Sequence, residues 1–247
     1  MSDKRKNELS INIKEVREEI DRLALAANRN PQDISLICVG KNYSLTDILL
    51  ANEVGATEFG ENRVQELQQK QAIYAKLPDD KQRQYKINWH FIGTLQRNKV
   101  KDIVGKVKLI HSVHSIKLIK QISRVSVRFN VVSEILLQIN VSQELSKQGL
   151  YVDQLETAIN VVLQSPNLCL RGLMTMAPYY SDPADAEPLF AKTKELLAKY
   201  QPMVGSHFNQ LSMGMSNDYQ YAIAQGATMI RIGTRIFGAR NSVGINN

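Results

Sequence analysis

The sequence predicts a single (β/α)8 barrel of the α/β class, with one extra helix at the N-terminus. Three observations carry this prediction: eight short apolar runs, amphipathic stretches between them, and a length of 247 residues. Repeated strand–helix units favour a parallel sheet, and eight of them in this length fit a closed barrel. An open doubly wound sheet is the alternative, although no G-x-G-x-x-G follows the first run. No linker-like segment divides residues 1–247, so we expect one domain.

The apolar runs have the composition of buried strands, because they are rich in Val and Ile and are bounded by Gly, Asn or Ser. They cover residues 34–41, 57–62, 88–93, 109–115, 134–141, 168–175, 208–214 and 229–237.

The segments between the strands include three plausible helices, at residues 44–55, 182–200 and 216–227. Ser44 and Asp47 resemble a capping box at the first helix, and Ser216 is the expected N-cap of the third. The polar segment 76–87 is expected to be a surface connection.

The chain opens with an amphipathic helix whose apolar residues recur every three or four positions. These residues are Leu9, Ile13, Val16, Ile20 and Leu23, and Asn30 and Pro31 end the pattern. The sequence ends soon after the eighth strand, so a final barrel helix is missing. We expect the N-terminal helix to cover that gap.

The composition argues against several classes of protein. The net charge is +7, from 31 Lys and Arg against 24 Asp and Glu, but the only tight basic cluster is residues 4–6. A nucleic-acid surface would need a basic stripe with interleaved aromatic residues. No apolar run reaches membrane-spanning length, and no secretory signal follows the charged N-terminus. Cys38 and Cys169 lie in apolar runs and are expected to be buried, reduced thiols. We expect a soluble cytoplasmic protein without nucleic-acid or membrane partners.

A lysine stands at the end of the first predicted strand. Lys41 follows the apolar residues 36–39, where a charged amine is costly unless it is paired. Desolvation or a nearby cation favours the neutral form of such an amine, which is a nucleophile suited to imine formation with an aldehyde. The spacing alone favours the alternative, a lysine that extends past the strand end into solvent.

The seventh and eighth strand ends have the features of a phosphate site. Met215 and Ser216 follow Gly214 just before a predicted helix, so their N–H groups are expected at a helix N-terminus. Gly233 permits close backbone approach, and Thr234 adds a hydroxyl donor. The loops after strands seven and eight are the usual phosphate site of this barrel. The alternative is an ordinary capped turn beside a glycine bulge.

These residues lie in motifs that resemble the pyridoxal 5′-phosphate (PLP) homeostasis proteins, a family of PLP-binding proteins similar to the barrel domain of alanine racemase. The motifs are FGENRVQE (59–66), WHFIGTLQRNK (89–99), IHSVHS (110–115), ELSKQG (144–149), GLMTM (172–176), LSMGMSNDY (211–219) and RIGTRIFGAR (231–240). The resemblance covers nearly the whole chain.

The resemblance implies a cofactor, PLP, and a set of roles. Lys41 corresponds to the lysine that holds PLP as an imine, and Arg231 to the arginine that faces the pyridine nitrogen. Met215, Ser216, Gly233 and Thr234 correspond to phosphate contacts, Asn62 to a residue near the ring, and Met174 and Thr175 to residues of the wall.

Arg231 has a chemical consequence within this resemblance. Arginine stays protonated and only donates hydrogen bonds, so a pyridine nitrogen that faces it stays unprotonated. An unprotonated ring is a weak electron sink, which mutes carbanion chemistry.

The sequence also departs from the family. Family members often read Ser-Lys-Thr-Lys-Pro at the anchoring lysine, whereas residues 40–44 here read Gly-Lys-Asn-Tyr-Ser. A second lysine is therefore absent, and Lys147 is a conceivable secondary acceptor, although a solvated loop lysine is the ordinary interpretation. His90, His111 and His114 do not have a metal-binding spacing and are expected to be structural.

The resemblance implies a monomeric, non-catalytic carrier that binds PLP and supplies or buffers it, with PLP-dependent apo-enzymes as possible recipients. An amino-acid racemase is the alternative. Racemases of the related type need a second acid/base, a tyrosine from a further domain that the sequence lacks. A third interpretation makes Lys41 the base of an aldolase acting on a sugar phosphate.

Overall fold

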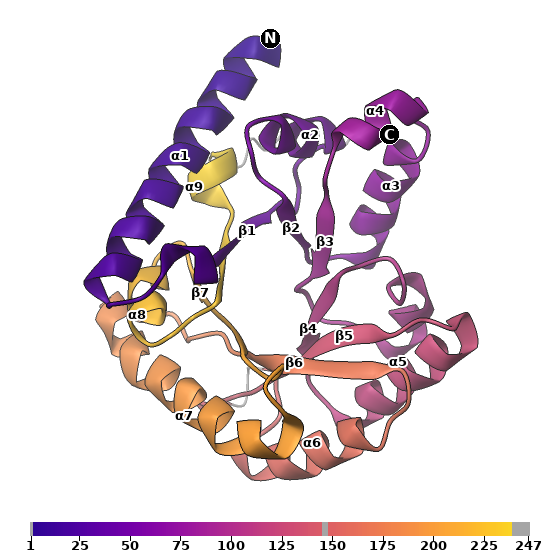
Figure 1. Ribbon diagram of the computed structural model, residues 1–247, viewed down its shortest axis with the longest axis vertical. Coiled ribbons are helices and arrows are strands. Elements are labelled where there is room, and N and C mark those ends of the chain that lie inside the picture. Colours follow the sequence, from indigo (N-terminus) through magenta and orange to yellow (C-terminus); the bar gives the residue numbers. More distant parts are fainter. Residues whose placement is uncertain (1, 145–147, 239–247) are drawn as a thin grey trace.

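The structure of the protein, a computed structural model, describes residues 2–144 and 148–238. Its strands form a closed, all-parallel barrel in which each strand pairs with the next and β8 pairs with β1 (Figure 1). The strands are β1 Ser35–Val39, β2 Glu58–Glu61, β3 Asn88–Phe91, β4 Leu109–Val113, β5 Ser133–Gln138, β6 Leu168–Met174, β7 Gln210–Met215 and β8 Met229–Ile232. The predicted (β/α)8 fold is confirmed.

Helices surround the barrel on its outer side (Figure 1). Those of the described chain are α1 Ser2–Ala26, α2 Leu45–Glu53, α3 Val64–Tyr74, α4 Asp79–Gln84, α5 Ile116–Phe129, α6 Leu155–Leu163, α7 Glu187–Val204, α8 Tyr219–Ala224 and α9 Thr234–Phe237. The capping box expected for α2 is present, with the Ser44 and Asp47 side chains each accepting from the other's backbone N–H.

Two boundaries near the carboxyl end of the barrel differ from the prediction. Helix α8 begins at Tyr219 with Asp218 as its N-cap, so Ser216 lies outside the helix and is not its cap. Strand β8 ends at Ile232 rather than at residue 237, because Gly233 turns the chain into the short helix α9.

Two further expectations need correction. The segment 76–87 is not only a connection, because it contains α4, whose first turn carries Asp79 and Asp80 after Pro78. Of the two free cysteines, Cys38 is buried as expected, but Cys169 is only partly buried.

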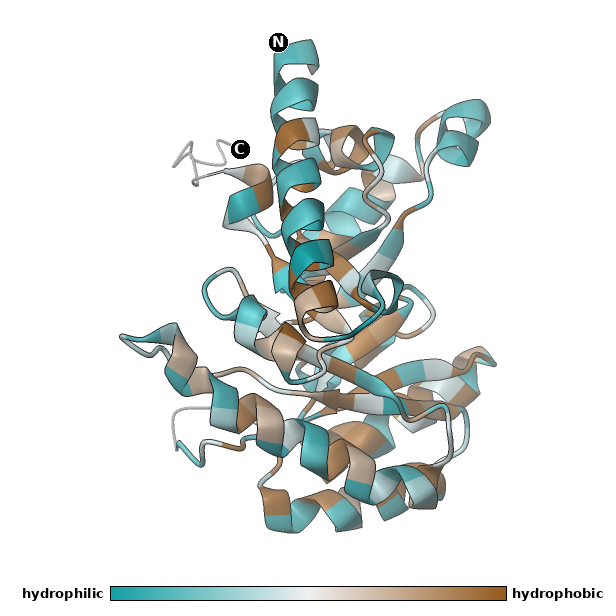
Figure 2. Cartoon of the chain, turned by 60° about the vertical axis from the view of Figure 1, so that its left-hand side comes forward, coloured by the Kyte–Doolittle hydropathy of each residue, from teal (hydrophilic) through white to brown (hydrophobic). Residues whose placement is uncertain are grey.

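Helix α1 lies in the outer ring of helices, at the place where it was expected to pack. It packs against α2, α8 and α9 and so closes the outer ring beside β8 and β1 (Figure 1). Its residues Leu9, Val16 and Ile20 are almost fully buried, while Ile11 on the same helix is exposed. In Figure 2 the face of α1 turned to the viewer is largely hydrophilic, whereas the strands behind it are largely hydrophobic.

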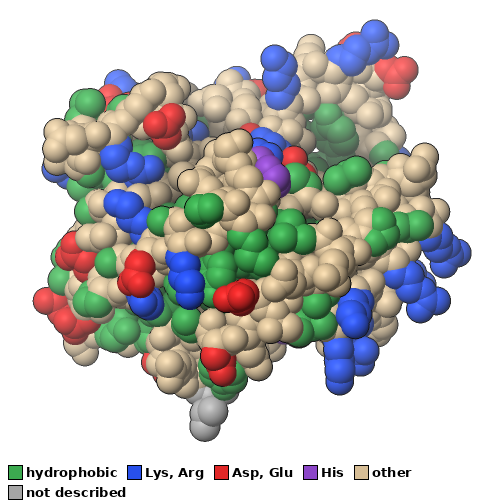
Figure 3. Space-filling model, turned by 60° about the horizontal axis from the view of Figure 1, so that its bottom comes forward, with side chains coloured by type: hydrophobic (Ala, Val, Ile, Leu, Met, Phe, Trp, Pro, Cys, Tyr) green, Lys and Arg blue, Asp and Glu red, His purple; other side chains and the backbone are tan. Residues whose placement is uncertain are grey.

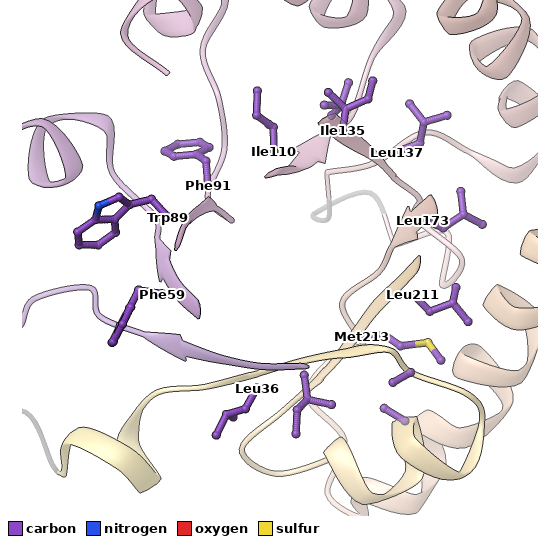
Figure 4. Packing of buried hydrophobic residues seen from close by; sticks show 14 of the residues in the cluster. Leu36, Phe59, Trp89, Phe91, Ile110, Ile135, Leu137, Leu173, Leu211 and Met213 are labelled. Atoms are coloured by element: carbon purple, nitrogen blue, oxygen red, sulfur yellow. The ribbon is translucent and has the colours of Figure 1, made fainter. Parts of the chain in front are cut away.

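The strands bury apolar side chains on two sides. Alternate residues such as Leu36, Phe59 and Leu173 point outward into the layer between strands and helices (Figure 4). The residues between them point to the barrel axis, where Ile37, Leu109, Leu136, Met174 and Met229 form a smaller apolar cluster. This alternation decides which polar side chains lie inside the barrel.

Candidate functional site

Strand pairing brings the predicted site residues together at one end of the barrel. Met174 pairs with Ser212 on β7, and Met215 pairs with Arg231 on β8. Strand β8 continues the ring to β1, which pairs with β2 through Val39 and Gly60. Lys41 and Asn62 each lie two residues beyond that last pair. The predicted residues therefore occupy the carboxyl ends of five neighbouring strands, β6, β7, β8, β1 and β2, the face where barrels of this type place their sites.

Lys41 lies in a tight turn between β1 and α2. The N–H of Tyr43 donates to the Gly40 carbonyl at 3.0 Å, and Asn42 adopts a left-handed conformation with φ 67°. Asparagine tolerates this region better than most residues, which suits the third position of the turn. Gly40 has no room for a side chain, since a Cβ there would lie 2.6 Å from Ile48 Cδ1. The turn is thus fixed by its own sequence.

A cavity of about 350 Å³ opens beside β7 and β8. It is lined by Met215, Ser216 and Thr234, three of the predicted phosphate contacts, and by Tyr179 and Tyr180 from the loop after β6. Gly233, next to Thr234, approaches β1 closely, because a Cβ there would lie 3.4 Å from both the Cβ and the carbonyl oxygen of Val39. The cavity therefore offers the hydroxyl groups of Ser216 and Thr234 as donors.

The backbone of Met215 is engaged in a way that the sequence did not predict. Its N–H donates to Oδ1 of Asp218 at 2.6 Å. Asp218 is buried, and that burial raises the pKa of its carboxyl group. The Met215 N–H is thus directed at a carboxylate. Among the predicted phosphate contacts that line this cavity, Ser216 and Thr234 are the two with polar side chains that can bind an anion.

Arg231 is buried inside the barrel near its carboxyl end. Nη1 donates to Ser212 Oγ at 2.6 Å, and Nη2 donates to the Thr175 carbonyl at 3.1 Å. Burial lowers the pKa of Arg231 to about 10, which still leaves the guanidinium charged at neutral pH. Two of its donors are therefore fixed by the protein, and its orientation is set.

Ser212 begins a hydrogen-bonded chain that runs down the barrel axis. His111 Nδ1 lies 2.8 Å from Ser212 Oγ, and His111 Nε2 lies 2.8 Å from His90 Nδ1. His90 Nε2 lies 2.6 Å from Oε2 of Glu58, which also accepts from Lys108 at the amino end of the barrel. The predicted structural role of these two histidines agrees with this arrangement.

The two ends of this chain have fixed directions. Arg231 can only donate, so the Ser212 hydroxyl accepts from it. A carboxylate can only accept, so His90 Nε2 donates to Glu58. Burial, with Arg231 and His90 nearby, holds the pKa of His111 well below its usual value. Although burial opposes it, hydrogen bonds from His90 and Asn88 lower the pKa of Glu58 to about 2.

Asn62 and Met174 occupy different depths of the site. The Oδ1 atom of Asn62 is buried and has no hydrogen-bond partner among the described residues. Such an atom is costly unless a ligand or water satisfies it. The backbone of Asn62 is held against Gly93, where a Cβ would lie 2.0 Å from the Asn62 carbonyl oxygen. Met174, the last residue of β6, is fully buried in the apolar cluster on the barrel axis.

Several residues around the site were missed by sequence reasoning. The sequence analysis did not single out Ser212, Glu58, Asp218, Tyr179 or Tyr180. The sequence contains a signal for the hydrogen-bonded residues on the barrel axis. His90 lies between Trp89 and Phe91, which face outward, so the His90 side chain faces the barrel axis. A polar side chain at an inward position of a buried strand needs a partner across the barrel.

The structure also bears on metal binding, on membrane insertion and on the reactivity of Cys38. Within residues 2–144 and 148–238, no group of His, Cys, Asp or Glu could hold a metal ion. No helix of that same part of the chain is long and apolar enough to cross a membrane. Burial raises the pKa of the Cys38 thiol to about 12, so this cysteine is a poor nucleophile. Lys147 lies outside the described residues.

Comparison with known proteins decides the family. Residues 11–241 match the family model of the alanine racemase N-terminal domain. A pyridoxal phosphate homeostasis protein of Pseudomonas aeruginosa is 38% identical over 230 residues, which are 93% of this chain and 95% of that protein. One from Aquifex aeolicus is 37% identical, with 92% of this chain and 96% of that protein covered. This chain belongs to that family.

Solved structures of this family's fold agree with the barrel. PipY of Synechococcus elongatus, solved with PLP bound, is 34% identical with a TM-score of 0.76, and the match covers 89% of this chain and 99% of PipY. A protein of unknown function from Bifidobacterium adolescentis gives a TM-score of 0.89 at 28% identity, covering 96% and 97% of the two chains. An alanine racemase of Clostridium difficile, 13% identical with a TM-score of 0.69, shares the fold; 96% of this chain matches 58% of it.

Proposed function

We propose that this protein binds PLP, holds it as an imine on Lys41, and acts in PLP homeostasis by supplying or buffering the cofactor. One observation carries the proposal: the Lys41 turn lies at the same barrel end as the cavity that presents Ser216 and Thr234. The homeostasis proteins to which the chain is similar, and PipY with its bound PLP, support the same ligand.

The donor set of the site suits PLP. The PLP aldehyde needs a lysine amine, which Lys41 provides. The phosphate needs hydrogen-bond donors, which are the hydroxyls of Ser216 and Thr234, with Gly233 as the wall beside it. The pyridine nitrogen needs a polar side chain, which is Arg231. The buried, unpartnered Oδ1 of Asn62 and the Met174 side chain complete the surroundings that we assign to the ring.

Bound PLP supplies a reactive aldehyde and an electron-withdrawing ring. Lys41 would hold the aldehyde carbon covalently. Arg231, whose other donors are fixed on Ser212 and Thr175, would donate to the ring nitrogen and keep it unprotonated. The ring is then a weak electron sink, which favours retention of the cofactor over turnover of amino acids.

We therefore assign the protein a non-catalytic role as a carrier or regulator. The setting that goes with this role is the cytoplasm, with the protein as a monomer and PLP-dependent apo-enzymes as recipients of the cofactor. Neither nucleic acid nor a membrane has a part in it. On the face that Figure 3 shows, the Lys and Arg side chains are dispersed, and hydrophobic and uncharged atoms cover most of the surface between them.

Two assays on the pure, PLP-loaded protein test this role. We expect PLP to pass to a PLP-free transaminase, restoring its activity, whereas the reduced, covalently fixed adduct restores none. We also expect no sustained interconversion of L- and D-alanine. Racemisation that disappears in Lys41→Ala would show a racemase instead, and failure to restore the transaminase would rule out the supply role.

A further inference from the structure

A buried ionic cluster lies on the outer side of the barrel directly behind the Lys41 turn. Lys70 of α3 has its Nζ atom 2.5 Å from Glu61 Oε1 of β2 and 3.0 Å from Glu66 Oε1 of α3. The side chains of Lys70 and Glu61 are 5% and 0% exposed, so this is an interior cluster rather than a surface ion pair. None of these three residues is among the cofactor contacts assigned above.

The cluster binds both peptide groups that flank Lys41. Lys70 Nζ donates to the carbonyl of Gly40 at 2.8 Å, which is the peptide group before Lys41. Glu66 Oε1 accepts from the N–H of Asn42, which belongs to the peptide group after Lys41. Restraining both peptide planes restrains the backbone of the residue between them, and with it the direction of its Cα–Cβ bond.

The two faces of β1 separate this cluster from the cofactor side. A side chain at Gly40 would meet Ile48 of α2 and Glu61 Oε1, so position 40 faces the helices. Ile37 faces the barrel axis, whereas Gly40 and Glu61 lie on the helix side of the barrel wall. The cluster therefore contacts the Lys41 backbone from the helix side of β1, outside the space that we assign to PLP.

Stability alone is a weak reason for such a cluster. Buried ion pairs lose much solvation energy, and well-packed apolar residues of similar volume often serve folding equally well. Burial also raises the pKa of Glu61 to about 7, even though Lys70 lies beside it. The cluster does, however, make two directed hydrogen bonds, to the Gly40 carbonyl and to the Asn42 N–H. Both lie in the turn that carries the Lys41 amine.

We propose that Lys70, Glu61 and Glu66 are positioning residues that hold the Lys41 amine in the geometry for imine formation. This inference rests on the proposed function and deepens it. A misplacement of about 1 Å at a reacting group can cost ~100-fold in rate. The cluster therefore sets how fast and how tightly Lys41 captures PLP, rather than whether the barrel folds.

The sharpest test compares Glu66→Ala with Glu66→Gln. Both remove the charge, but glutamine keeps an oxygen that accepts from the Asn42 N–H. Glu66 is 18% exposed, and Lys70 keeps Glu61 and the Gly40 carbonyl as partners, so both variants should fold. We expect Glu66→Ala to slow imine formation and weaken PLP binding by about tenfold or more, and Glu66→Gln to restore most of both.

A second variant removes the other tether. Lys70→Met with Glu61→Leu replaces the buried pair by apolar residues of similar volume and frees the Gly40 carbonyl, and we expect the same loss of PLP binding. Lys6→Met is the control, because it breaks an ion pair with Glu53, which lies at the opposite end of α2 from the turn. For each variant, two quantities are also measured on the PLP-free protein. They are the melting temperature and the rate at which an acylating reagent labels Lys41.

The outcomes separate this inference from the function on which it rests. Support requires an altered Lys41 labelling rate and weaker PLP binding at an unchanged melting temperature, with rescue in Glu66→Gln. Wild-type labelling and binding in Glu66→Ala, or losses that merely follow unfolding, would overturn the positioning role. If wild-type protein forms no imine on Lys41, the proposed function fails, and the labelling rates still decide whether the cluster controls the amine.

Discussion

Arg231 is the residue whose surroundings say most about the chemistry of the site. Its two fixed hydrogen bonds leave the guanidinium no freedom to rotate away from the strand end. The chain from Ser212 through His111 to Glu58 continues from this fixed guanidinium toward the amino end of the barrel. In the proposed role, this fixed cation faces the ring nitrogen of the bound PLP.

The state of His111 gives a prediction for stability against pH. Its folded pKa lies below the ordinary value near 6.5, so the unfolded chain binds the extra proton once the pH falls below that value, and stability is lost as the pH falls. Relative to His111→Gln, the wild-type free energy of unfolding should decrease by about 1.4 kcal/mol per pH unit below 6.5. Urea unfolding at pH 7.5, 6.0 and 5.0 measures this. A difference that does not change with pH would show that the pKa of His111 is the same in the folded and the unfolded protein.

Ser216 gives a second prediction at the same scale. Its hydroxyl is the side-chain donor after β7 that we assign to the phosphate, and a hydrogen bond to a charged group contributes about 1.5–3 kcal/mol. Ser216→Ala should therefore weaken PLP binding by roughly tenfold or more, with little change in melting temperature.

Ser165→Ala is the matched control for this measurement. The Ser165 hydroxyl donates to the Val161 carbonyl before β6, at the opposite end of the barrel. We expect PLP titration to give the wild-type dissociation constant for this variant. Equal affinities for Ser216→Ala and the wild type would remove Ser216 from the phosphate site.

Among the elements, helix α1 is the one whose role the sequence predicted fully. Its three- and four-residue repeat predicted an apolar face, and that face packs against the helices that flank β8 and β1. The boundary of α8 was harder, because Ser216, Asn217 and Asp218 are all residues that cap helices well. Local sequence did not decide among them. The buried Asp218 carboxylate turns to the Met215 N–H, a contact made only once β7 is in place.

Helix α1 should contribute strongly to stability through its buried face. Ile20 is fully buried there, while Ile11 on the same helix is 57% exposed. Ile20→Ala should lower the free energy of unfolding by about 2–5 kcal/mol, whereas Ile11→Ala should change it by less than about 0.5 kcal/mol. Urea unfolding of the two variants checks this pair. Similar losses in both would mean that α1 does not pack on the barrel as described.

At the scale of the whole molecule, the order of strands was predictable and the contacts across the barrel were not. Eight strand-like runs predicted the ring, and with it the end that carries Lys41 and Arg231. The axial chain joins His111 to Ser212, which lie 101 residues apart. The sequence shows that these are polar residues in strands, but only closure of the barrel brings them within hydrogen-bond distance. The cluster behind Lys41 was missed for the same reason, since Lys70 and Gly40 belong to different strand–helix units.

The central claim is that Lys41 anchors PLP. The measurement that tests it most directly is the visible absorption spectrum of the protein with PLP, before and after borohydride reduction, followed by mass spectrometry of the Lys41 peptide. We predict an imine band in the wild type that reduction converts into a pyridoxyl adduct on Lys41, and no such band in Lys41→Ala. An unchanged band in that variant, or an adduct on another lysine, would contradict the account.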